Sequence, residues 1–172
     1  DPFWRVHPGA LPYTQEGTKA GLARKEAVHS DDVQRDLTAV LDACRHHRQS
    51  NGRCLVLGIC FGGRFAWKAA LQREVEAAIL WHAAGLSPLL ATVSQLTVPL
   101  EHHLGDSDPL IPEEEVTAMQ QAMSLFDHLV CHVHPGAVHG FTHTSKRESY
   151  DANATKASIK CVMGWIQTLK TM

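Results

Sequence analysis

The chain has 172 residues, of which 44% are hydrophobic and 20% are charged, and its formal net charge is −2 at pH 7. This size and composition predict a single soluble globular domain over residues 1–172, with a hydrophobic core. The near-balance of charge excludes a strongly basic surface, so we expect neither nucleic acid nor a membrane as a partner. No hydrophobic run reaches the roughly 20 residues that a membrane-spanning helix needs.

The cysteine content bears on the cellular compartment. There are five cysteines, an odd number, and none forms a CxxC pair. A domain of this length does not depend on disulfides for stability, and no signal peptide is recognisable at the first residues. We therefore expect a reducing, cytoplasmic location.

The chain begins with a segment rich in proline and glycine, residues 1–29, which predicts a loop with at most a short helix. Ser30 is a suitable N-cap for the next helix. Its hydrophobic residues are predicted to share one face: Val33, Leu37, Val40, Leu41 and Cys44. Asn51-Gly52 then predicts a turn.

Short hydrophobic strands and amphipathic helices alternate in the rest of the chain. The strands are predicted at residues 53–58, 77–82, 98–104 and 129–134. One helix is predicted at residues 61–71 and another at residues 150–170. Between them, a helix is predicted to begin with Pro112 as its first helical residue. Its hydrophobic stripe consists of Val116, Met119 and Met123. The last helix is expected to turn five residues inward: Ile159, Val162, Met163, Ile166 and Leu169. This order predicts an α/β fold with a mostly parallel sheet flanked by helices. Sites in such folds lie beyond the carboxyl ends of the strands.

Cys60 directly follows the first of these strands, in the sequence Gly58-Ile59-Cys60-Phe61-Gly62-Gly63. A nucleophile between glycines, at a strand-to-helix turn, sits in a strained conformation above the sheet. The backbone N–H of Phe61 could then stabilise an oxyanion. The alternative is a buried cysteine that only packs, beside glycines that let the helix approach the strand.

Two further strand ends carry residues that could complete a catalytic triad. Asp108, preferred over Asp106, follows the third strand, and His139 follows the fourth. Each has a simple alternative, since Asp is common in turns and the chain has twelve histidines. Nucleophile, acid and histidine nevertheless occur in the chain order of α/β-hydrolases, which favours catalysis over three coincidences.

The segments "GICFGG", "GDSDPLIP" and "HPGAVHGF" resemble the three catalytic motifs of the dienelactone hydrolase (carboxymethylenebutenolidase) family, a cysteine branch of the α/β-hydrolases. The opening "DPFWRVHPG" is similar to the segment that follows the third strand in that family. The resemblance implies an α/β-hydrolase fold, with Cys60 as nucleophile, Asp108 as orienting acid and His139 as base. It also implies hydrolysis of a small ester or lactone without a cofactor.

The resemblance also indicates where this sequence departs from the pattern of the family. Family members carry preceding chain with the first strands, a second oxyanion donor and an activating glutamate, so the strand at residues 53–58 is expected at an exposed sheet edge. An N-terminal segment or a homodimer partner could cover it. Arg5 matches one of two arginines that bind a substrate carboxylate, the other position is His143, and Trp4 could line the same pocket.

Two other functions are compatible with the sequence. A catalytically weak family relative could act as a ligand-binding or redox-sensitive protein. A metal site could use four histidines: His102, His103, His132 and His134. No cysteine or aspartate at a suitable spacing completes that ligand set, so we expect no metal.

Overall fold

The computed structural model describes residues 2–172. The chain divides into two compact units, Asp1–Val40 and Leu41–Met172. The boundary falls inside helix α2 (Ser30–His46). None of the helices in the described residues has the length and hydropathy that crossing a bilayer requires.

The first unit contains helix α1 (Gln15–Ala27), whose 13 residues exceed the short helix expected from sequence. Its residues show no hydrophobic stripe, which is why periodicity did not reveal it. The helix is instead held by polar contacts. The Thr14 hydroxyl accepts from the Gly17 N–H at 3.1 Å, and Arg24 donates to the Gly9 carbonyl at 2.7 Å.

Helix α2 begins at Ser30 itself, so this residue is not the predicted cap. Of the predicted hydrophobic face, Leu41 is buried, whereas Val40 is 56% exposed and Cys44 is also exposed. A helical period shows which side chains share a face, but it does not show whether another element covers that face.

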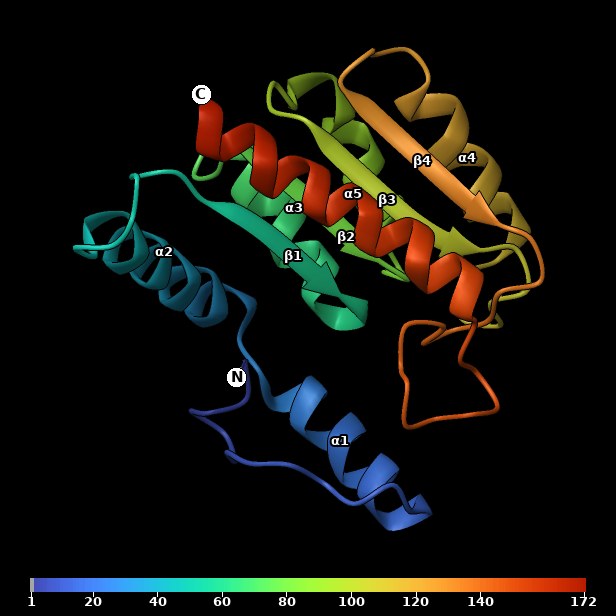
Figure 1. The fold of residues 1–172 in the computed structure, drawn as a ribbon. Coiled ribbons are helices and arrows are strands. Elements are labelled where there is room, and N and C mark those ends of the chain that lie inside the picture. Colours follow the sequence, from blue (N-terminus) through green and yellow to red (C-terminus); the bar gives the residue numbers. More distant parts are fainter. Residues whose placement is uncertain (1) are drawn as a thin grey trace. The chain divides into compact units, whose positions relative to one another are not determined.

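The second unit is built on a four-stranded parallel sheet, as predicted. Its strands are β1 (Leu55–Ile59), β2 (Ala77–Trp81), β3 (Leu100–Gly105) and β4 (Leu129–His134), in the order β1-β2-β3-β4. Helices α3 (Gly63–Leu71) and α4 (Glu113–Met123) cover one face, and α5 (Ala152–Thr171) covers the other (Figure 1). Two short 3-10 helices are η1 (Cys60–Gly62) and η2 (Ser87–Gln95).

The core of this unit lies between the sheet and α3. Trp67 of α3 is fully buried, and its indole N–H donates to the Thr92 hydroxyl at 3.0 Å. The α4 stripe of Val116, Met119 and Met123 is buried as predicted. The predicted start of α4 is wrong by one residue, however, because Pro112 is the N-cap and Glu113 is the first helical residue.

The inward face predicted for α5 is partly wrong. Ile159 and Met163 are 46% and 49% exposed, although Leu169 is buried. The buried face contains small polar residues instead. Thr155 donates its hydroxyl to the Phe141 carbonyl at 2.8 Å, and Ser158 donates to the Ala154 carbonyl at 2.7 Å. These bonds let polar side chains be buried, and a hydrophobic pattern does not detect them. The helix starts at Ala152 after the Asp151 cap, not at Tyr150.

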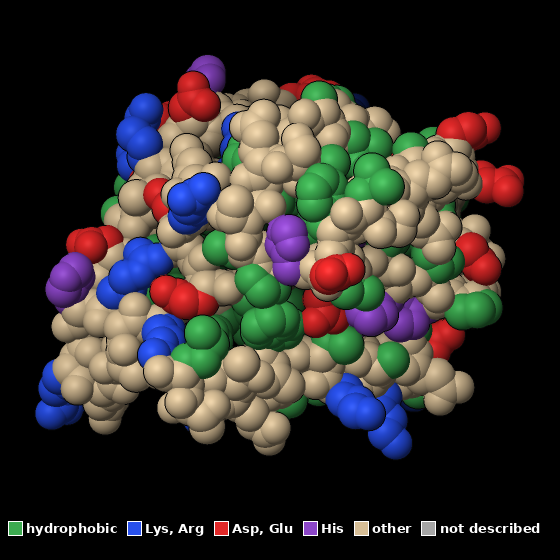
Figure 2. All heavy atoms as spheres, turned by 90° about the horizontal axis from the view of Figure 1, so that it is seen from above, with side chains coloured by type: hydrophobic (Ala, Val, Ile, Leu, Met, Phe, Trp, Pro, Cys, Tyr) green, Lys and Arg blue, Asp and Glu red, His purple; other side chains and the backbone are tan. Residues whose placement is uncertain are grey.

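Strand β1 is at the edge of the sheet, as expected from the resemblance. Its last residue, Ile59, is 48% exposed. Figure 2 shows other hydrophobic side chains at the surface, on a face that carries both acidic and basic residues.

Candidate active site

The turn after β1 has the strained geometry that the sequence predicts for a nucleophile. Cys60 has a φ of 50°, in the left-handed region that residues other than glycine rarely adopt. Two glycines allow α3 to start this close to the strand. A Cβ on Gly58 would lie 2.7 Å from Ala66 Cβ, and a Cβ on Gly63 would overlap Ala83 Cβ. The glycine spacing is therefore required by packing around the turn.

Three side chains from separate strand ends form one hydrogen-bonded series. The Nε2 atom of His139 lies 3.1 Å from the Cys60 sulfur, and its Nδ1 lies 2.8 Å from Asp108 Oδ2. Asp108 is buried, and its Oδ1 accepts the Leu110 N–H at 2.8 Å. The fold thus brings together the three residues that the sequence selects.

The geometry also separates Asp108 from its rival. The Oδ1 of Asp106 accepts the Gly136 N–H at 2.7 Å and the Ser107 hydroxyl at 3.1 Å. Asp106 therefore links the turn after β3 to the turn after β4, whereas Oδ2 of Asp108 lies 2.8 Å from Nδ1 of His139.

The electrostatics of the series favour a thiolate and an imidazolium. Burial raises the pKa of Cys60, but contacts with His139, His82 and the Phe61 N–H outweigh it and lower that pKa to about 6. Burial lowers the pKa of His139, but the Asp108 hydrogen bond and the sulfur raise it to about 9. Between these values, the charged pair is the favoured state.

His82 is part of this site, and the sequence interpretation missed it. It is 4% exposed, has a φ of 37°, and its ring meets that of His139 edge-on at 4.9 Å between centroids. Its Nε2 lies 3.1 Å from the Thr142 hydroxyl. A signal was present, because His82 directly follows β2 at the same edge of the sheet as the other strand ends.

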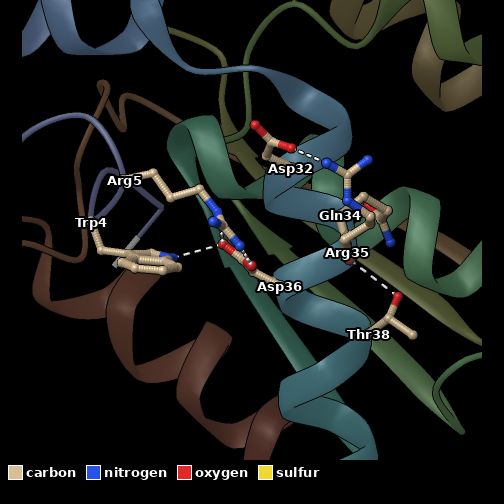
Figure 3. Close-up of polar contacts among 7 residues, drawn as sticks. All are labelled: Trp4, Arg5, Asp32, Gln34, Arg35, Asp36 and Thr38. Atoms are coloured by element: carbon tan, nitrogen blue, oxygen red, sulfur yellow. Dashed lines mark hydrogen bonds and ion pairs between the residues drawn. The ribbon is translucent and has the colours of Figure 1, made fainter.

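Trp4 and Arg5 belong to the first unit, where both bind Asp36 of α2 (Figure 3). The Trp4 indole N–H donates to Oδ2 at 2.7 Å, and Arg5 Nη2 donates to Oδ1 at 2.6 Å. Both side chains thus have a carboxylate of the chain itself as their hydrogen-bond partner. His143 is half-buried in the loop that holds His139. The substrate-binding role of all three stays a prediction.

The four histidines considered as metal ligands do not form one group. His102 and His103 are neighbours on β3, so they point to opposite faces of the sheet. Burial lowers the pKa of His102 to about 3, which keeps it neutral. His103 and His132 share the α5 side, where their rings stack at 4.3 Å between centroids.

The parallel sheet between helices, with a nucleophile-type turn after β1, defines the α/β-hydrolase fold. A dienelactone hydrolase-like promiscuous phosphotriesterase from metagenomic libraries shares this fold, with a TM-score of 0.72 and 20% identity over 95% of this chain and 72% of that chain. The profile of the dienelactone hydrolase family matches residues 9–170. The chain therefore belongs to the dienelactone hydrolase family.

Two curated relatives are similar over a large part of the sequence. A carboxymethylenebutenolidase of Pseudomonas putida is 29% identical over 156 residues, which are 90% of this chain and 66% of the relative. Carboxymethylenebutenolidase 1 of Cupriavidus pinatubonensis is 27% identical over 125 residues, which are 73% of this chain and 53% of the relative. The chain thus spans about two thirds or less of their length.

Proposed function

We propose that the protein hydrolyses small esters or lactones, with Cys60 as nucleophile, His139 as base and Asp108 as orienting acid. The observation that carries this proposal is the hydrogen-bonded series of these three residues on a strained turn. Membership of the dienelactone hydrolase family supports the substrate class. No cofactor is part of the proposal.

The reaction follows from the geometry. The Cys60 thiolate attacks the carbonyl carbon, and the carbonyl oxygen becomes an oxyanion that the Phe61 N–H stabilises. The carbon–oxygen single bond of the ester then breaks, and His139 Nε2–H protonates the leaving oxygen. Water attacks the acyl-thioester while His139 accepts its proton, and the thiolate leaves. Asp108 holds the His139 tautomer throughout.

Substrate binding is proposed for Trp4, Arg5 and His143. Arg5 and a protonated His143 would favour a substrate that carries a carboxylate. The Arg5–Asp36 ion pair is exposed, so a substrate carboxylate could compete for the guanidinium at small cost.

The edge strand supports a further proposal about partners. The free edge of β1 and the exposed Ile59 would be covered by additional strands, from preceding chain or from a second copy in a homodimer. A monomer in sedimentation whose β1 amides also exchange rapidly with solvent would contradict both ways of covering the edge. The five free cysteines support the proposal of a reducing, cytoplasmic location.

The test of the activity is the substitution Cys60→Ala, assayed on p-nitrophenyl acetate and on small lactones. We expect kcat/KM to fall by about a thousandfold or more, because the nucleophile is lost while the rest of the site remains. Cys44→Ala is the matched control, since it removes an exposed thiol and should leave the rate unchanged.

The same assay separates the rival function, a weak relative that binds ligands or senses redox state. Hydrolysis that survives in the Cys60→Ala variant contradicts the proposed mechanism. Slow, ordinary alkylation of Cys60, together with no hydrolysis of any ester, thioester or lactone tested, would favour the rival.

A further inference from the structure

A second cluster of reactive side chains lies between the sheet and α5, apart from the residues of the proposed triad. Glu101 and His103 come from β3, His132 from β4 and Cys161 from α5. One ligand-type atom of each lies within 4.8 Å of those of the other three. His103 and His132 are register partners, and Glu101 is on the same face of β3 two residues earlier.

The atoms of this cluster do not satisfy one another fully. His132 Nε2 lies 2.8 Å from Glu101 Oε2, but His103 Nε2 lies 3.7 Å from the same oxygen, which is too long for a hydrogen bond. His103 is 1% exposed, and its Nε2 has no hydrogen-bond partner among the described residues. A buried imidazole nitrogen that lacks a hydrogen-bond partner and faces a carboxylate and a thiol can bind a cation in the tautomer that leaves this nitrogen a lone pair.

Neighbouring residues orient two of these groups. The Trp165 indole N–H donates to Glu101 Oε1 at 2.6 Å, which leaves Oε2 facing the cluster. The Nδ1 of His103 is 3.1 Å from His134 Nε2, which leaves Nε2 of His103 to face the cluster as well. Bonds of this kind, to the atoms that do not bind the ion, are typical of protein metal sites.

We propose that Glu101, His103, His132 and Cys161 bind one zinc ion, which attaches α5 to β3 and β4. One sulfur, two imidazole nitrogens and one carboxylate oxygen form a set that suits Zn²⁺, whereas Mg²⁺ and Ca²⁺ take oxygen ligands. On binding, the Cys161 thiol loses its proton to solvent, and the thiolate coordinates the ion.

The site has four protein ligands, so no position is left for a water or a substrate. This is the arrangement of structural rather than catalytic zinc. Three of the ligands belong to adjacent strands, and the fourth is in the middle of a 20-residue helix. The ion would therefore stabilise the folded chain by linking the last helix to the sheet.

The experiment uses the purified protein with Cys60→Ala, so that the other reactive thiol cannot bind metal. Metal-free protein is titrated with Zn²⁺ by calorimetry and with Co²⁺ by visible spectroscopy. We expect one equivalent to bind, with the absorption of four-coordinate Co²⁺ and a thiolate-to-metal charge-transfer band. Zn²⁺ at a hundredfold excess over Kd should raise Tm by about 5 °C.

The substitutions Cys161→Ser and His132→Gln are expected to raise Kd about a hundredfold or more, and Cys161→Ser should remove the charge-transfer band. Cys131→Ala is the matched control, because this neighbouring thiol packs on the α4 side of the sheet. It should keep the stoichiometry and the band.

Trp165→Phe keeps all four ligands and tests the site if a ligand variant fails to fold. Loss of the indole donor should raise Kd about tenfold. The proposal is overturned if no stoichiometric binding occurs, or if the band and affinity survive in Cys161→Ser. It is also overturned if they disappear in Cys131→Ala while circular dichroism shows that variant folded.

Discussion

At the scale of single residues, the central property is the charge state of Cys60 and His139. Asp108 and the sulfur raise the pKa of His139 to about 9, and the imidazole and the Phe61 N–H help to lower the pKa of Cys60 to about 6, although burial opposes each shift. The thiol is therefore expected to be a thiolate at neutral pH, as a nucleophile requires.

This state predicts a pH dependence. As the pH rises through about 6, Cys60 loses its proton and its alkylation by iodoacetamide should accelerate, whereas an ordinary thiol accelerates only near pH 8.5. Hydrolysis should rise over the same range and fall above about pH 9, where His139 loses the proton that it gives to the leaving group. Stopped-flow rates and kcat/KM against pH measure both.

Two variants control for this assignment. Asp108→Asn keeps the acceptor for the Leu110 N–H but weakens support for the imidazolium, so the alkylation profile should move to higher pH. Asp106→Asn should leave the profile in place, because Asp106 bonds to Gly136 and Ser107 instead. An unchanged profile in Asp108→Asn would contradict the proposed role of Asp108.

At the scale of elements, the contact of α3 with the sheet determines where Cys60 lies. Gly63→Ala would place a Cβ onto the Cβ of Ala83, which is bonded directly to the backbone and cannot rotate away. We expect a loss of about 2 kcal/mol in the free energy of unfolding, because overpacking outweighs the gain in helix propensity. Urea denaturation measures the change.

The neighbouring glycine provides the control for that prediction. A Cβ on Gly62 would meet nothing within 4 Å, so Gly62→Ala should be neutral or stabilise by up to about 1 kcal/mol. Adding Ala83→Gly to Gly63→Ala removes the overlap and should restore part of the loss. Equal effects at both glycines would show that packing against Ala83 is not the cause.

At the scale of the whole molecule, the two units differ in how they are held. The α1 helix buries only Gly17 and Arg24, whereas β2 has four consecutive buried residues. Regions with little buried hydrophobic surface open at low free energy. Amides of residues 15–27 should therefore exchange hydrogen for deuterium at least about tenfold faster than those of β2 and β3 in mass-spectrometric exchange. Equal protection would contradict this prediction.

The sequence by itself determined the four parallel strands, the helices between them and the family. It could do so because short hydrophobic strands and amphipathic stripes are local signals, and because Cys60, Asp108 and His139 each follow a strand directly. It was wrong about Ile159 and Met163, since hydrophobic periodicity does not reveal which face a neighbour covers.

Only the tertiary structure decided which distant side chains meet. It placed His82 against His139. It also brought Cys161 of α5 close to Glu101, His103 and His132, although the spacing of these residues along the sequence does not indicate a ligand set. The physical reason is that a helix packed across a sheet brings together side chains from distant parts of the chain, such as Glu101 and Cys161, at positions set by packing and register rather than by the interval along the chain.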